Sequence, residues 1–296
     1  MSNQLTRVLV ALVLIPAVLG VVWWGGLPLA LLVAAAAVLG TRELFVLART
    51  AGVRPLAPLG ILGAVVFPLG AWWMWGGFSL YLGGVSPAWI GSPAMPTPYV
   101  VALFALVVLT GTLWRRAPGD RPLAAGAITF LAPFYCGALP SFVLGIRYGT
   151  GPGRSWPATW AVFFPLAVTW ICDTLAMFGG KALKGPKLAP VVSPGKTRSG
   201  AVSGVVGGIL AGLVYAKLAL EPSGFQLPLW QVLVFGLVLS VVAQIGDLAE
   251  SLFKREAGVK DSGGLIPGHG GVLDRLDSLY FVLPVAAMLY RAFGVL

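Results

Sequence analysis

The stretch 244–277 holds most of the side chains in this sequence that could do chemistry. Six of the ten Asp and Glu of the chain fall within it, interleaved with Lys and Arg. If the apolar helix leading into this stretch continues past Gly246, four polar residues share one helix face: Asp247, Glu250, Ser251 and Lys254. Asp274 and Asp277 lie one helical turn apart after a glycine-rich turn. Two carboxylate-bearing helix ends joined by a loop can therefore converge on one cation.

The donor types predict which cation this is. Carboxylates with a single histidine and no paired cysteines favour a hard ion such as Mg²⁺ over zinc, and Mg²⁺ commonly binds one or two carboxylates plus substrate phosphates. Four basic residues of the stretch could neutralise phosphate oxygens: Lys254, Arg255, Lys260 and Arg275. Carboxylates and cations within one short loop indicate metal-assisted phosphoryl chemistry. His269 could be a general base, but a phosphate nucleophile needs none, which leaves it a positioning or hydrogen-bonding role or a purely structural one.

A second polar stretch, 181–198, contains the segment Ser193, Pro194, Gly195, Lys196 and Thr197. It is not a phosphate loop, because the Gly-x-x-x-x-Gly-Lys-Ser/Thr pattern requires glycine where the chain has Pro190. Gly195 nevertheless permits close backbone approach, Lys196 supplies a positive charge, and Thr197 supplies a hydroxyl just before a helix. A helix start of this kind is a ready phosphate site, and an ordinary helix cap in a basic loop is the alternative.

The elements that must position these groups are membrane helices. The sequence is 58% hydrophobic and only 10% charged, with a mean hydropathy of +0.90, whereas charged residues usually reach about 25% in soluble domains. We expect an all-α, polytopic integral membrane protein of about nine transmembrane helices, one membrane domain over 1–296 with N-terminal helices in 1–150 and a catalytic region in 156–296. The nine apolar runs are 8–24, 27–40, 56–75, 99–114, 123–146, 156–180, 201–216, 227–246 and 278–290.

Asp173 interrupts the sixth of these runs, and Asp247 follows the eighth. Ionisable groups at membrane depth are costly, so both are functional candidates, with a buried ion pair as the alternative reading.

The basic residues predict the orientation. With the N-terminus inside and alternating spans, 16 of the 20 Lys and Arg fall on inside segments, as the positive-inside rule requires. Both polar stretches then face the cytoplasm around a polar cavity, and the C-terminus lies outside. The net charge of +10 is spread over the connectors and forms no basic stripe, so we expect no nucleic-acid partner.

The stretch from Ser251 to Asp277 resembles the signature of the phosphatidate cytidylyltransferases, also called CDP-diacylglycerol synthases. That signature runs S-x-apolar-K-R, four residues, K-D, a small-residue loop, P-x-H-G-G and apolar-x-D-R-apolar-D. Every fixed position is met, namely by Ser251, Lys254, Arg255, Lys260, Asp261, Pro267, His269, Gly270, Gly271, Asp274, Arg275 and Asp277. The segment around Asp173 and the run KLAPVVSPGKT resemble the family's second common region, where Arg198 and Ser199 stand in place of the usual Trp and a polar residue. The resemblance is specific over the second half of the chain.

The resemblance implies transfer of a cytidylyl group from CTP to phosphatidic acid, giving CDP-diacylglycerol and pyrophosphate, in a bacterial inner or plasma membrane. It implies Mg²⁺ bound by Asp247 and Asp274, with Asp277 and Asp261 close behind, and a potassium ion sharing the site. The nucleotide phosphates would be held from Ser193 to Thr197. Lys254, Arg255 and Arg275 would hold the lipid head group or the triphosphate, with Asp173, Ser251, Lys260 and His269 as further substrate contacts. A homodimer among membrane lipids is the implied assembly.

Two other functions are compatible with parts of the pattern. A secondary transporter would account for Asp173 within a span and for glycines that break helices, but it would move substrate without consuming CTP. A CDP-alcohol phosphotransferase also uses aspartates and Mg²⁺, but its D-G-x-x-A-R start is absent from this sequence.

Overall fold

The computed structural model describes residues 3–77, 96–151, 154–264 and 270–296, and these residues are almost entirely helical. The sheet found among them has two short antiparallel strands, β1 (Lys187–Ala189) and β2 (Ser193–Thr197). The α-helices are α1 (Asn3–Trp24), α2 (Gly26–Thr50), α3 (Ala57–Trp72), α5 (Pro96–Arg115), α6 (Pro122–Pro133), α7 (Phe142–Gly149), α8 (Trp156–Leu183), α9 (Arg198–Tyr215), α10 (Leu229–Glu256), α11 (Leu273–Leu276) and α12 (Leu279–Ala292). The shorter helical turns are η1 (Trp73–Gly77), η2 (Pro118–Asp120), η3 (Phe134–Ala138), η4 (Ala216–Leu220) and η5 (Glu221–Ser223).

Six helical segments of the described chain are long and apolar enough to cross a membrane. They are Gly26–Thr50, Ala57–Trp75, Pro122–Gly149, Trp156–Leu183, Arg198–Ser223 and Leu229–Glu256. A segment of 28 residues such as Trp156–Leu183 is about 42 Å long, which exceeds the roughly 30 Å of bilayer hydrocarbon. The chain is therefore an integral membrane protein, as its composition predicts.

All nine predicted apolar runs coincide for most of their length with helices, but nine crossings stay a prediction. The apolar part of α5, Tyr99–Arg115, is shorter than the six long segments. The 14 residues of α12 extend only about 21 Å. Most of α12 is buried against other helices, including Tyr280 and Tyr290, whose side chains are fully buried.

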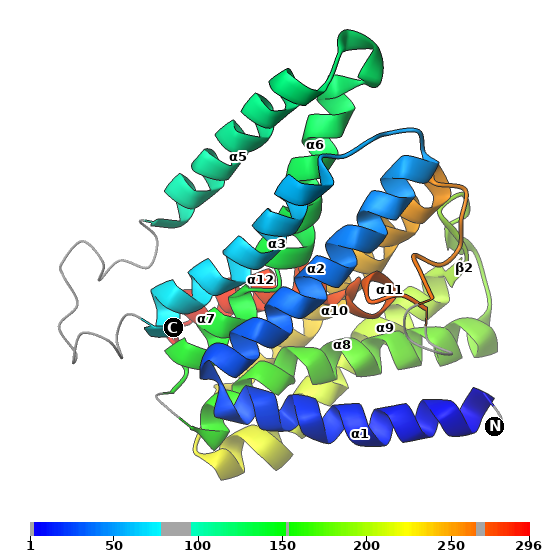
Figure 1. Ribbon diagram of the computed structural model, residues 1–296. Coiled ribbons are helices and arrows are strands. Elements are labelled where there is room, and N and C mark those ends of the chain that lie inside the picture. Colours follow the sequence, from blue (N-terminus) through cyan, green and yellow to red (C-terminus); the bar gives the residue numbers. More distant parts are fainter. Residues whose placement is uncertain (1–2, 78–95, 152–153, 265–269) are drawn as a thin grey trace.

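The N-terminal and C-terminal helices share one hydrophobic core. In Figure 1, α2, α3, α5 and α6 run side by side, while α1 and α8 run across their ends. The largest cluster of buried side chains joins Leu29 of α2 to Phe164 of α8, Phe235 of α10 and Tyr290 of α12. Buried side chains from both halves of the chain thus contact one another, while the single membrane domain over 1–296 stays a prediction.

Helices α8 and α9 approach each other closely because α9 presents glycines to α8. A Cβ added to Gly200 would lie 2.6 Å from the carbonyl oxygen of Ala176, and one added to Gly204 would lie 3.0 Å from that of Cys172. Small residues permit such backbone contact between membrane helices. The approach holds β2, which leads directly into α9, over the end of α8 that follows Asp173.

A second close crossing joins α10 to the start of α12. A Cβ added to Gly246 would lie 2.9 Å from the carbonyl oxygen of Asp277 and 3.1 Å from the Cα of Ser278. Since Asp247 follows Gly246 directly, this crossing brings Asp247 and Asp277 to the same place. The convergence of two carboxylate-bearing helix ends follows from this one glycine contact.

Candidate active site

Four polar side chains lie on one face of α10, as the sequence predicts. The helix continues without interruption past Gly246 to Glu256. The Ser251 hydroxyl lies 3.4 Å from Asp247 Oδ1, and Lys254 Nζ lies 3.1 Å from Glu250 Oε1. Glu250 is fully buried and Lys254 is 9% exposed. A buried carboxylate of this kind needs a cation beside it, which Lys254 supplies from one turn further along.

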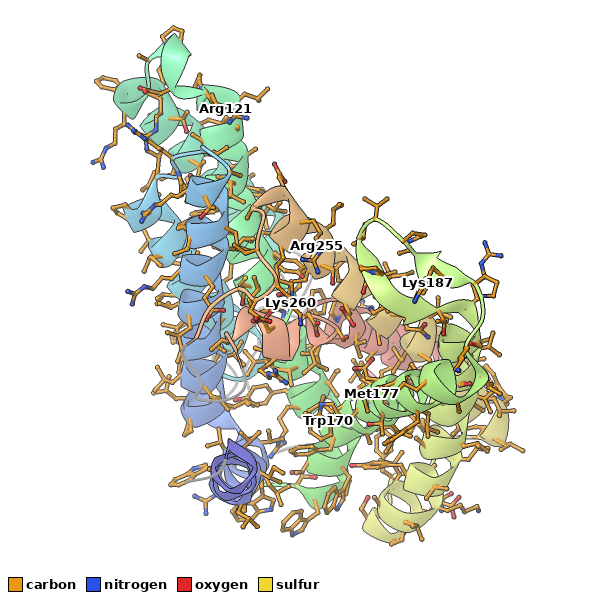
Figure 2. The ribbon with its side chains drawn as sticks, turned by 90° about the vertical axis from the view of Figure 1, so that its right-hand side faces the viewer. Arg121, Trp170, Met177, Lys187, Arg255 and Lys260 are labelled. Atoms are coloured by element: carbon orange, nitrogen blue, oxygen red, sulfur yellow. The ribbon has the colours of Figure 1, made fainter. Side chains whose placement is uncertain are left out.

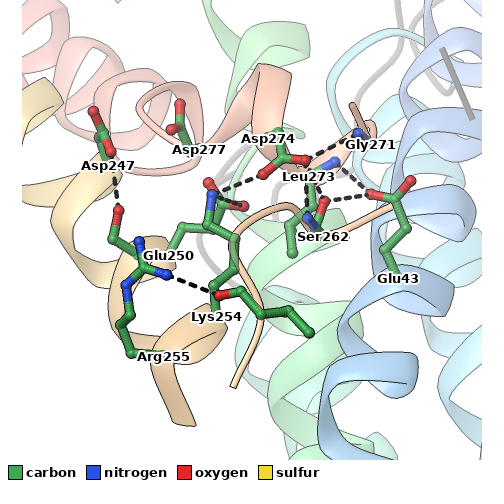
Figure 3. Close-up of polar contacts among 12 residues, drawn as sticks. Glu43, Asp247, Glu250, Lys254, Arg255, Ser262, Gly271, Leu273, Asp274 and Asp277 are labelled. Carbon is green, nitrogen blue, oxygen red and sulfur yellow. Dashed lines mark hydrogen bonds and ion pairs between the residues drawn. The ribbon is translucent and has the colours of Figure 1, made fainter. Parts of the chain in front are cut away.

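Lys254 also binds Asp274, whose two oxygens accept four hydrogen bonds (Figure 3). Lys254 Nζ donates to Asp274 Oδ1 at 2.7 Å. Oδ2 accepts the backbone N–H of Ser262 at 3.0 Å, the Ser262 hydroxyl at 2.9 Å and the N–H of Gly271 at 2.9 Å. Burial alone would raise the pKa of Asp274, but these donors and the Lys254 charge outweigh it and lower the pKa to about 2. Asp274 is thus held ionised as part of the framework of the site.

Asp277 and Asp247 form a second carboxylate group beside the first. Burial, and then the negative charge of Asp247, raise the pKa of Asp277 above its usual value. One of its oxygens accepts the N–H of Ser278 at 2.6 Å. Figure 3 shows Asp277 between Asp247, which comes from α10, and Asp274, which comes from α11.

The segment 193–197 meets this carboxylate group through Lys196. Lys196 Nζ lies 2.6 Å from Asp247 Oδ2 and so links β2 to α10. Thr197 caps the next helix, since its hydroxyl accepts the N–H of Gly200 at 3.1 Å. The helix predicted to begin just after the hydroxyls of Thr197 and Ser199 is found, but it begins at Arg198 and already includes Ser199.

A cavity of about 550 Å³ opens where α8, the β-hairpin, α9 and α10 meet. Its charged lining residues are four lysines and two aspartates: Lys181, Lys184, Lys187, Lys196, Asp173 and Asp247. Gly195, Thr197 and Gln244 complete its polar wall. This volume and this balance of charge suit a polyanion the size of a nucleotide.

Some predicted site residues lie away from this cavity. Ser193 and Pro194 do not line it, whereas the next three residues of β2 do. Arg255 lies at the end of α10 (Figure 2), where it donates to the carbonyl oxygens of Val192 at 3.1 Å and Val259 at 3.0 Å. It therefore ties the β-hairpin to α10.

The remaining predicted residues lie in or beside the loop after α10. Lys260, Asp261 and Arg275 are exposed. Pro267 and His269 lie outside the described residues, so their predicted roles stay predictions.

Sequence reasoning missed two contributions to the site. Lys181, Lys184 and Lys187 were counted only as inside positive charges, although their spacing of three was a signal for one basic face. Glu43 of α2 was not singled out, although it is an ionisable residue in the middle of an apolar helix. Its carboxylate contacts the loop that carries Asp274.

The donor set at Asp247 and Asp277 fits Mg²⁺ in part. The described residues contain no group of three or more Asp, Glu, His or Cys placed as metal ligands. Mg²⁺ commonly uses only one or two carboxylates and completes its shell with water and substrate phosphates. Asp247 and Asp277 offer such a pair, and a cation between them would offset the repulsion that raises the pKa of Asp277. Asp274 already accepts four hydrogen bonds, so its role is to hold the chain next to Asp247 and Asp277.

Comparison with known proteins identifies the family. The sequence model of the cytidylyltransferase family matches residues 5–293. The phosphatidate cytidylyltransferase of Brucella abortus is 38% identical over 291 residues, which cover 98% of this chain and 93% of that protein. The chloroplastic phosphatidate cytidylyltransferase 5 of Arabidopsis thaliana is 35% identical over 302 residues, covering 93% of this chain and 69% of its own length. The Staphylococcus saprophyticus phosphatidate cytidylyltransferase is 43% identical over 128 residues, covering 43% of this chain and 48% of its own length. The chain belongs to the cytidylyltransferase family, and it is a membrane-embedded nucleotidyltransferase.

Proposed function

We propose that this protein is a phosphatidate cytidylyltransferase, which converts CTP and phosphatidate into CDP-diacylglycerol and pyrophosphate. The names of its relatives support this substrate pair. The observation that carries the proposal is the cavity lined by four lysines and two aspartates at the end of membrane-spanning helices. A water-soluble nucleotide and a membrane lipid can both reach a site in such a place.

The lysines of the cavity bind the triphosphate of CTP. Lys181 and Lys184 at the end of α8, and Lys187 and Lys196 on the hairpin, line it from two sides. A triphosphate carries about four negative charges near neutral pH, and charge-assisted hydrogen bonds to phosphate are among the strong ones. Gly195 permits close backbone approach to the phosphates, and the Thr197 hydroxyl adds a hydrogen bond along the same strand.

Asp247 and Asp277 would hold Mg²⁺, and Asp274 would support them through its contact with Lys254. When bound there, the ion offsets negative charge on the α-phosphate and on the departing pyrophosphate. Lys196 pairs with Asp247 at 2.6 Å, so the two groups need new partners when substrate arrives. Lys196 would then pair with the triphosphate, and Asp247 would be free to hold Mg²⁺. The potassium ion implied by the family signature stays a prediction.

The chemical step needs positioning more than proton transfer. A phosphatidate oxygen attacks the α-phosphorus of CTP, a new P–O bond forms, and the bond to the β-phosphate bridging oxygen breaks. The nucleophile is already an anion, so the protein supplies alignment and charge stabilisation and no base. Arg275, Lys260 and Arg255 are exposed cations in and beside the loop after α10, and they attract the lipid head group.

The site faces the cytoplasm, where CTP is made, with the N-terminus inside and the C-terminus outside. The supporting observation is that 16 of 20 basic residues fall on the segments that this arrangement places inside. Dimerisation, implied by the family signature, stays a prediction.

The test is transfer of label from CTP into lipid by the purified protein in detergent with phosphatidate and Mg²⁺. We expect labelled CDP-diacylglycerol from the wild type and none when phosphatidate is omitted. Asp247→Asn should abolish labelling, while Glu256→Gln, an exposed carboxyl at the end of the same helix, should not. Well-folded wild-type protein that transfers no label would refute the proposed function, and CTP-independent substrate flux in liposomes would favour a transporter instead.

A further inference from the structure

Glu43, in the N-terminal helix α2, reaches across to the loop that carries Asp274. Its Oε1 accepts the N–H of Val272 at 3.0 Å, and its Oε2 accepts the N–H of Leu273 at 2.7 Å. Oε2 also lies 3.2 Å from the Ser262 hydroxyl. We propose that Glu43 is a positioning residue of the transferase, holding the loop so that Asp274 and Asp277 keep their places. The inference rests on the proposed function and adds to it a part of the first half of the chain.

The polar groups of this loop donate hydrogen bonds to two carboxylates, those of Asp274 and Glu43. Of three consecutive backbone N–H groups, that of Gly271 donates to Asp274 and the next two donate to Glu43. The Ser262 hydroxyl lies within hydrogen-bonding distance of both carboxylates but has one hydrogen to give. Glu43 thereby fixes the backbone on the C-terminal side of Gly271, and Asp274 fixes it on the N-terminal side. From Asp274 the contacts continue to Lys254 and Glu250 on α10 (Figure 3).

The loop is shaped to admit the Glu43 carboxylate. A Cβ added to Gly271 would lie 2.5 Å from Glu43 Oε2, and one added to Gly263 would lie 3.0 Å from Oε1. Side chains at either position would displace the carboxylate. The neighbouring Gly264 has nothing within 4 Å of an added Cβ, so it does not share the close contact that Gly263 and Gly271 make with Glu43.

The contact requires a carboxylate and not only a polar group. All its partners are donors, and glutamine would replace one accepting oxygen by an NH₂ group that faces them. At least one backbone N–H would then lose its partner, which drives the loop away from α2. Because Asp277 lies one turn beyond Asp274, a shift of the loop moves both. A displacement of about 1 Å in a catalytic group costs roughly 100-fold in rate.

The test compares Glu43→Gln and Glu43→Asp with the control Glu256→Gln in the labelling assay. We expect Glu43→Gln to lower kcat by about 10- to 100-fold and to change the KM for CTP little, because the lysine-lined cavity is untouched. Glu43→Asp should restore part of the loss, and the control should match wild type. Hydrogen exchange at Val272 and Leu273 should be faster in Glu43→Gln.

A glycine pair tests the same region without replacing Glu43, since a Cβ at Gly271 would meet both the Ser262 hydroxyl and Glu43 Oε2. Gly271→Ala should reproduce the loss of kcat, whereas Gly264→Ala, in the same loop, should not. The inference is overturned if active wild-type protein and Glu43→Gln have equal kcat per folded molecule. It is overturned also if the loss only follows thermal stability and Glu43→Asp gives no rescue. Wild-type protein without CTP-dependent labelling would overturn the proposed function itself, which separates the two failures.

Discussion

Replacing Asp274 by asparagine should weaken the fold as well as the chemistry, by an amount that the structure sets. The pKa of Asp274 falls from its usual 3.8 to about 2 in the folded protein. Each pKa unit corresponds to about 1.36 kcal/mol, so the charged form contributes about 2.5 kcal/mol to stability at neutral pH. The side chain is only 9% exposed, so solvent screens this contribution little.

The asparagine adds a further cost. Lys254 would keep Glu250 but lose its ion pair with Asp274. If the asparagine oxygen takes the place of Oδ1, its NH₂ group faces the backbone N–H groups of both Ser262 and Gly271. If the oxygen takes the place of Oδ2, the NH₂ group faces the Lys254 ammonium instead. Together these effects place the loss at about 2 to 4 kcal/mol.

The assay is equilibrium unfolding in mixed detergent micelles, with Asp261→Asn as the matched control. Asp261 is exposed and one position before Ser262, so its replacement should change the free energy of unfolding by less than about 0.5 kcal/mol. Because the folded pKa lies below the unfolded one, the Asp274 contribution is present above about pH 4. It is lost as the pH falls toward 2. Asp274→Asn should lack this part of the acid dependence. A variant as stable as wild type at pH 7 would refute the reasoning.

Two further changes test other parts of the structure. Lys196→Gln should weaken CTP binding at least about 10-fold, because one charged contact to phosphate is lost; titration calorimetry against Lys217→Gln, whose lysine forms an exposed pair with Glu221, measures it, and equal affinities would remove Lys196 from the nucleotide site. Gly200→Ala should cost about 1 to 3 kcal/mol, since its Cβ would meet the Ala176 carbonyl at 2.6 Å. Gly70→Ala in α3 has open space around it and should be neutral or slightly stabilising in the same unfolding assay.

The sequence predicted the helices well because apolar runs in a membrane protein are long and hydrogen-bond within themselves. It also predicted the shared face of α10 and the helix start after Thr197, because both depend on spacing over a few residues. Six segments of the described residues are long and apolar enough to span a membrane, so the nine predicted crossings stay a prediction. The 14 residues of α12 show that an apolar run in the sequence does not by itself fix the length of the helix.

The different surroundings of the three aspartates are a second feature that the sequence could not predict. Asp247, Asp274 and Asp277 look equivalent in the sequence, as carboxylates near helix ends. In the structure Asp274 faces four donors, two of them backbone N–H groups from a loop that contains no periodic pattern. Asp277 instead faces the negative charge of Asp247, because Gly246 lets α10 touch the start of α12. The contact between α10 and the start of α12 therefore decides which aspartate faces positive and N–H groups and which one faces a second carboxylate and could attract a cation.

Glu43 is the residue for which distance along the chain matters most. It lies 229 and 230 positions from the two backbone N–H groups that it binds. No spacing rule links groups so far apart, yet a carboxylate within an apolar helix is costly unless it has partners. The free-energy cost of placing a carboxylate in an apolar helix was the sequence signal that could have pointed to Glu43. The structure shows that its partners belong to the loop of the active site. In a membrane protein of this composition, each acidic residue inside a helix is therefore best assigned by asking which donors could compensate it. Glu43→Gln, by removing that compensation from α2 alone, tests whether the first half of the chain takes part in positioning the catalytic groups.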